Sequence, residues 1–108
     1  MIAGNALDVI VANKVMGWIF DGVGWRDGDA HYGINALPRV STEPGYMWMV
    51  VERMERLGHE MIMSTKGTRQ EGSSVAYIVS FGGKDNEMTA DTAALAICLA
   101  ALKVLKQL

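Results

Sequence analysis

Aromatic and basic side chains gather between residues 18 and 48, and together they have the chemistry of a site for a flat, phosphorylated ligand. Arg26 and Arg39 carry planar guanidinium groups, which bind phosphate through two parallel hydrogen bonds. The aromatic residues whose rings could stack on such a ligand are Trp18, Trp25, Tyr32, Tyr46 and Trp48. We therefore predict a nucleotide-like ligand. The competing interpretation is that Trp18 and Trp48 pack in the core and that the arginines are solvated.

Two expected helix starts add anion-binding groups to this set. Ser41 or Thr42 is expected to cap one helix, and Thr89 or Thr92 is expected to cap another, whose N-terminus Asp91 supports. The first backbone N–H groups of a helix have no partner within it, so they favour anions such as phosphate. We therefore include Ser41, Thr42, Asp91 and Thr92 among the candidate ligand-binding residues.

Residue types that could support catalysis or metal binding are sparse. Asp27, Asp29 and His31 are the candidate acid–base groups for a small hydrolase that acts on a nucleotide. Residues 18–40 are rich in glycine, and the aspartates among them lack the ligand spacing and the closing glutamate of an EF-hand. Cys98 lies in an apolar run, which predicts a buried and unreactive thiol. We expect neither an enzyme nor a bound metal ion or cofactor.

Length and charge restrict the class of protein. The chain has 108 residues, half of them hydrophobic, and a formal net charge of -2. These values predict a single globular domain spanning 1–108, without the basic excess of nucleic-acid binders. One cysteine cannot form an internal disulfide, and no apolar stretch is long enough to span a bilayer. Since the first residues also lack the pattern of a signal peptide, we expect a cytoplasmic protein that binds neither nucleic acid nor a membrane.

Hydrophobic spacing predicts the elements in the first half of the chain. Apolar residues recur at helical spacing over 5–16, where Asn5 would cap the helix and Gly17 would end it. Residues 18–40 contain too many glycines for a helix and are expected to form a long loop. A second amphipathic helix is expected over 44–57, with one apolar stripe.

The second half of the chain predicts a hairpin and an apolar helix. Residues 59–65 and 74–81 alternate as strands do, and a polar loop at 66–72 would join them. A polar turn at 82–88 leads to a helix at 93–102 that is apolar on nearly every face. Such a helix must be buried between layers or between copies of the chain, so we expect a homo-oligomer.

Three stretches together resemble a known family: 15–18 (VMGW), 41–54 (STE followed by WMVVERM at 48–54) and 90–102 (ADTAALAICLAAL). In this order they resemble the phage ABA sandwich domain family, small proteins of phages and prophages. The resemblance implies an α/β (α+β) fold, an α-β-α layered sandwich with about three helices and a small sheet that contains antiparallel strands. It also implies a phage or prophage protein in the cytoplasm of an infected bacterium. The resemblance carries no catalytic residue. Ala94 departs from the family pattern, in which proline is common.

Several functions remain open from the sequence. We expect a non-enzymatic phage protein that binds a small ligand and sequesters a nucleotide-derived immune signal of the host. The alternative is a protein–protein interaction module that inhibits or assembles a host or phage enzyme, with exposed Met and Trp side chains as its hot spot. The hydrolase described above ranks third.

Overall fold

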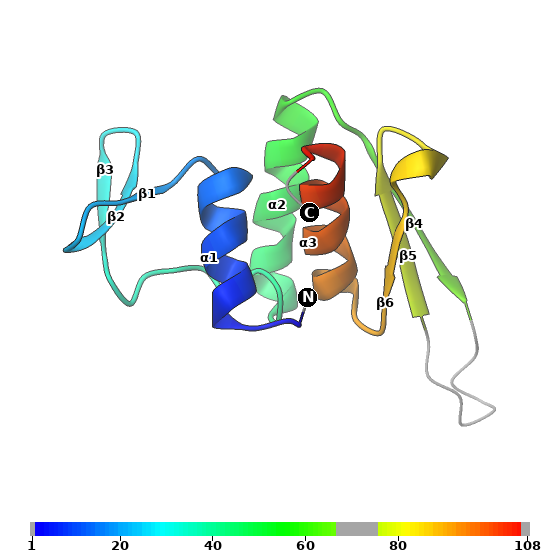
Figure 1. Ribbon diagram of the computed structural model, residues 1–108, viewed down its shortest axis with the longest axis horizontal. Helices are drawn as coiled ribbons and strands as arrows, with labels where there is room; N and C mark the ends of the chain where they lie inside the picture. Colours follow the sequence, from blue (N-terminus) through cyan, green and yellow to red (C-terminus); the bar gives the residue numbers. More distant parts are fainter. Residues whose placement is uncertain (1, 67–75, 107–108) are drawn as a thin grey trace.

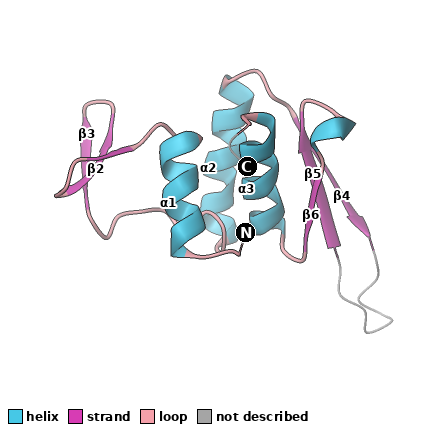
Figure 2. Cartoon of the chain, viewed as in Figure 1, coloured by secondary structure: helices cyan, strands magenta, loops and turns pink. Residues whose placement is uncertain are grey.

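The described residues form three α-helices and two small antiparallel sheets (Figure 2). The computed structural model describes residues 2–66 and 76–106. The helices are α1 (Asn5–Lys14), α2 (Pro44–Arg56) and α3 (Ala93–Val104), with a short 3-10 helix at Lys84–Asn86. Sheet A consists of β1 (Ile19–Phe20), β2 (Gly24–Asp27) and β3 (Ala30–Gly33). Sheet B consists of β4 (Met61–Lys66), β5 (Ala76–Phe81) and β6 (Met88–Ala90). The predicted α+β sandwich with three helices and antiparallel strands is confirmed.

Helix α3 forms the centre of the molecule. It contacts α1 and α2 as well as strands β5 and β6 (Figure 1). Its buried residues are Ala94, Ala96, Ile97, Cys98, Leu99, Ala100, Ala101 and Leu102. The chain itself therefore covers a helix that is apolar around its circumference, so this helix does not require a second copy to bury it. Thr92 caps α3 as predicted, because its Oγ1 accepts a hydrogen bond from the backbone N–H of Leu95 at 3.2 Å.

Sheet B contains the predicted hairpin. Strands β4 and β5 pair antiparallel, from Met61 opposite Phe81 to Lys66 opposite Ala76. Val79 and Phe81 are fully buried in the core that includes α3. The loop predicted at 66–72 lies outside the described residues after Lys66. Strand β6 was not predicted, because three residues beside a polar turn are too few to show an alternating pattern.

The predicted N-caps of α1 and α2 are wrong by one or two residues. Gly4 is the N-cap of α1, with a positive φ of 142° that glycine readily adopts, and Asn5 is the first residue of the helix. Glu43 is the N-cap of α2, in place of Ser41 or Thr42. Pro44 accounts for the second shift, since its fixed φ suits the first position of a helix and restricts the residue before it to extended backbone.

The C-terminus of α1 also differs from its prediction. The helix ends at Lys14, with Val15 as its C-cap, before the predicted end at residue 16. The backbone N–H groups of Val15 and Met16 both donate to the carbonyl oxygen of Val11, and the bond from Met16 spans five residues, so the helix ends in a turn wider than an α-helical one. Gly17 follows with φ of 78° and redirects the chain toward sheet A.

Residues 18–40 do not form the long loop that their composition predicts, because their middle part is sheet A. The glycines lie in its turns: Gly22 has φ of 91° between β1 and β2, and Gly28 has φ of 59° between β2 and β3. The carboxylate of Asp21 closes the first turn by accepting hydrogen bonds from the backbone N–H groups of Val23 and Gly24, at 3.0 and 2.9 Å. The glycines that exclude a helix thus supply the turns of an antiparallel sheet.

The three helices lie between the two sheets, with sheet B against α3 and sheet A beyond α1 (Figure 1). The order of layers within the chain is sheet, helices, sheet, and residues 18–40 supply the second sheet. All three helices run in the same direction, so their N-terminal ends lie at one end of the helical layer (Figure 1). In the part of the chain that the structure describes, no helix is both long and apolar enough to cross a membrane.

Candidate functional site

An aromatic row crosses sheet A. Phe20 pairs with Trp25, and Trp25 pairs with Tyr32, so the three rings share one face of the sheet. Directly paired residues of an antiparallel sheet point to the same side, while their neighbours along each strand point to the other. Arg26 and His31 therefore belong to the opposite face, where both are exposed.

Ring contacts attach this aromatic row to the helices. Trp18, in the segment between α1 and β1, stacks on Tyr32 with ring centroids 4.9 Å apart and planes inclined by 7°. Phe20 and Trp25 meet at 5.3 Å in a tilted arrangement. Trp18 and Trp25 are 5% and 6% exposed and form a second small core with Ala12 of α1. These two tryptophans are thus packing residues that also shape the surface between α1 and sheet A.

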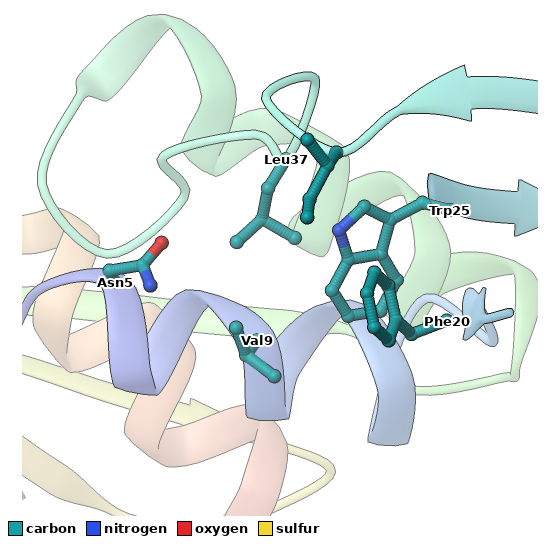
Figure 3. A pocket seen from close by; sticks show the side chains of 6 residues that line it. Asn5, Val9, Phe20, Trp25 and Leu37 are labelled. Atoms are coloured by element: carbon teal, nitrogen blue, oxygen red, sulfur yellow. The ribbon is translucent and has the colours of Figure 1, made fainter. Parts of the chain in front are cut away.

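A pocket of about 310 Å³ lies between α1, sheet A and the segment that leads from β3 to α2 (Figure 3). Its lining residues are Asn5, Val9, Phe20, Trp25, Ile34 and Leu37. Five of these six side chains are apolar or aromatic, and the polar groups among them are the amide of Asn5 and the indole N–H of Trp25. A small, mostly apolar concavity with few polar groups has the composition of a ligand site, at the small end of the usual size range.

A buried hydrogen-bond network holds one wall of this pocket in place. The Ser41 hydroxyl donates to Oδ1 of Asp8 at 2.6 Å, and the Ser41 backbone N–H donates to the same oxygen at 2.9 Å. The backbone N–H of Gly4 donates to Oγ of Ser41 at 3.0 Å. This network fastens the end of the segment that carries Ile34 and Leu37 to the first turn of α1.

The network also bears on the thiol of α3. Cys98 is buried, as predicted, and burial together with the negative charge of Asp8 raises its pKa to about 12. The thiol therefore stays protonated at any physiological pH, and a protonated, inaccessible thiol is a poor nucleophile.

The structure brings together only some of the residues predicted to bind a ligand. Trp25 lines the pocket, and Trp18 and Tyr32 pack beside it in the aromatic cluster. Arg26 lies on the opposite face of sheet A, and the side chain of Arg39, 71% exposed, pairs with Glu43 at 3.0 Å. The predicted phosphate clamp is therefore not assembled beside the aromatic rings.

The remaining candidates lie around the N-terminal ends of the helices. The Ser41 side chain is fully buried and bonded to Asp8, and the Thr92 hydroxyl caps α3. Thr42 and Asp91 are exposed, and Tyr46 is 43% exposed in the first turn of α2. Trp48, which the competing interpretation placed in the core, is 49% exposed. None of these residues lines the pocket beside Trp25.

Five of the six lining residues were not predicted as site residues: Asn5, Val9, Phe20, Ile34 and Leu37. The sequence places apolar residues within a glycine-rich segment, which is the one signal that could have indicated them. Their convergence depends on the register of sheet A and on the contact between sheet A and α1. Among the described residues, no group of three His, Cys, Asp or Glu side chains could hold a metal ion.

These features define a class of protein, a small α+β sandwich domain with an apolar pocket beside its first helix. The chain belongs to the phage ABA sandwich domain family, whose sequence profile matches residues 9–102. It is similar in fold to a solved phage protein from Bacillus cereus ATCC 14579, with a TM-score of 0.62 and 24% sequence identity. That similarity covers 95% of this chain and 89% of the other. No curated protein matches this sequence.

Proposed function

We propose that this protein is a non-enzymatic phage protein that binds a small ligand in the pocket between α1 and sheet A. The pocket itself carries the proposal: its volume of about 310 Å³ and its aromatic wall of Phe20 and Trp25 suit a flat ring. Phage family membership suggests a use for such binding, the sequestration of a nucleotide-derived immune signal of the host. Sequestration needs a preorganised pocket and no catalytic group.

The packing around the pocket supports preorganisation. Trp25 is fixed by the small core that it forms with Trp18 and Ala12, and Phe20 rests against Trp25. The opposite wall is held by the network of Asp8 and Ser41. A ligand would therefore not have to order these walls, and the entropic cost of binding would be small.

Calorimetric titration of the purified protein with nucleobases, nucleosides, cyclic nucleotides and ADP-ribose derivatives tests this proposal. The fluorescence of Trp25 supplies a second signal, since a bound ring would contact its indole. We expect Val9→Phe, which places a ring inside the pocket, to weaken binding by roughly tenfold or more. Ile62→Phe, the same kind of change at an exposed position of β4, is the matched control and should leave affinity unchanged. The proposal is wrong if no compound binds below micromolar concentration and heat-treated protein releases no ligand.

A second candidate function is a protein–protein interaction module. Three apolar side chains at sheet A and just after it are strongly exposed: Ile19 at 62%, Val23 at 83% and Ile34 at 57%. Exposed apolar side chains of this kind are available for contact with a protein partner. Affinity purification from infected cells separates the two functions, because a stoichiometric protein partner that is lost in Val23→Asp would favour the module.

A further inference from the structure

We infer that two copies of this chain pair through strand β4 and form a symmetric dimer in which the two copies of sheet B become one continuous sheet. This inference is independent of the proposed function, since it concerns the edge of sheet B and not the pocket beside sheet A. Two observations carry it. The first is an exposed edge strand, and the second is a pair of opposite charges, Glu60 and Lys66, that self-pairing of this strand brings together.

Strand β4 lies at one edge of sheet B (Figure 1). The order of the sheet is β4-β5-β6, so among the described strands only β5 pairs with β4. Within β4, Met61 is half-buried and every later residue is exposed, including the apolar Ile62 at 61% and Met63 at 40%. An exposed edge strand presents a row of backbone donors and acceptors that another strand can pair with. The free edge of β4 is therefore a surface for the addition of a strand.

The pairing of β4 with β5 identifies which backbone groups are free. The backbone N–H of Gly82 donates to the carbonyl oxygen of Glu60 at 3.2 Å, so these two residues form a hydrogen-bonded pair. Hydrogen-bonded and non-hydrogen-bonded pairs alternate along an antiparallel ladder. The even-numbered residues of β4 therefore direct their N–H and C=O groups to β5, and the odd-numbered residues direct theirs to the free edge. The residues with free groups are Met61, Met63 and Thr65.

A two-fold axis through Met63 pairs all of these free groups at once. Antiparallel pairing of two identical strands about this axis places Met63 opposite its own copy and Met61 opposite Thr65 of the other copy. Each of these pairs exchanges both of its N–H···O bonds. A shift of the axis along the strand leaves free groups of Met61 or Thr65 without a partner on the other β4, so this register satisfies the edge best.

The same register places opposite charges across the interface. Glu60 and Lys66 lie three positions before and after Met63, so Glu60 of each copy faces Lys66 of the other. Both residues are exposed, and neither forms an ion pair with a described residue of its own copy.

Alternation along the strand puts both charged side chains on the outer face of sheet B, where Glu60 and Ile62 border the same surface hollow. Opposite charges that face each other across an antiparallel pair stabilise it, and the symmetry of the dimer supplies this pair twice. A strand of unrelated sequence could use the free backbone groups of β4, but it would have to supply matching charges at both ends. The charge complementarity therefore favours a second copy of this chain.

Sedimentation-velocity ultracentrifugation of the whole chain over a concentration series tests the inference. We expect the protein to shift from monomer to dimer as its concentration rises to roughly 100 µM, since a single strand pair is a small interface of the weakly bound class. Glu60→Lys and Lys66→Glu each place like charges opposite each other twice, so either variant alone should dimerise roughly tenfold or more weakly. An equimolar mixture of the two variants should dimerise as the unmodified protein does, because every charge then faces an opposite one.

Asp29→Lys is the matched control, because it makes the same change of charge at an exposed position in the turn between β2 and β3. It should leave dimerisation unchanged and should not restore the dimer when it is mixed with Lys66→Glu. A protein that stays monomeric at every concentration would overturn the inference. So would a dimer that neither charge reversal weakens, or a mixture of the two variants that does not recover. These results leave the proposed function standing, since ligand binding in the pocket is measured separately.

Discussion

Replacement of Ser41 by alanine should cost this protein a large share of its stability. The Ser41 side chain is fully buried, and its hydroxyl takes part in two hydrogen bonds, one to the Asp8 carboxylate at 2.6 Å and one from the Gly4 backbone at 3.0 Å. A bond to a charged group contributes about 1.5–3 kcal/mol and a neutral bond about 0.5–1.5 kcal/mol. The backbone bond from Ser41 to Asp8 survives the substitution.

The expected loss for Ser41→Ala is therefore about 2–4 kcal/mol of unfolding free energy. A typical domain has only about 5–15 kcal/mol in total, so the variant should still fold but melt roughly 10–20 °C lower. Urea denaturation followed by far-UV circular dichroism measures the loss directly. Thr42→Ala is the control, since Thr42 is an exposed neighbour and should change stability by less than about 0.5 kcal/mol.

A double-mutant cycle with Asp8→Ala isolates the contact between the two side chains. Asp8→Ala leaves both donors of Ser41 without their carboxylate acceptor, so the single variants should not add. We expect a coupling energy of about 1.5 kcal/mol or more. If Ser41→Ala is as stable as Thr42→Ala, or if the cycle shows no coupling, the network does not hold the pocket wall and the reasoning above fails.

Three further predictions concern sheet A and the core. In Gly24→Ala the new Cβ would overlap the backbone carbonyl oxygen of Tyr32, so sheet A should be disrupted and ligand binding lost. Gly33→Ala, at the paired position with open space around it, should leave binding intact, and NMR amide shifts of the sheet distinguish the two. The Cys98 thiol, whose pKa is raised to about 12 from 9.0, should react with thiol reagents at pH 8 only after unfolding. Because the folded state favours the protonated thiol, Cys98 makes its full contribution to the free energy of unfolding below pH 9. This contribution is lost as the pH rises toward 12. A folded protein that reacts as fast as the unfolded chain would contradict this. Hydrogen bonds from the backbone N–H groups of Gly24 and Val23 lower the pKa of Asp21. The NMR titration midpoint of Asp21 should therefore lie below 3.8. Its contribution to the turn is present above that pH and is lost as the pH falls through the lower pKa, and a midpoint at or above 3.8 would exclude the closed turn.

Much of the helical layer and of sheet B was predictable from local pattern. The stripe of α2 and the apolar circumference of α3 follow from 3.6-residue spacing, and the pairing of β4 with β5 follows from alternation. The cap at Thr92 was correct because a helix N-cap depends on a few adjacent residues. The cap expected at Asn5 was wrong because Gly4 takes that position, and short-range pattern does not distinguish two good capping residues one position apart.

By itself, the sequence determined the class of fold and the burial of Cys98, because each depends on residue type and on periodicity along the chain. The family was identified from the resemblance of three short motifs. The tertiary structure alone decided that residues 18–40 form a sheet and that Phe20 and Trp25 line a pocket with Asn5. It also decided that Ser41 binds Asp8, 33 positions earlier, and so is not available to a phosphate. The physical reason is that strand register and contacts between distant segments are set by packing of the whole chain, which no local pattern of residues encodes.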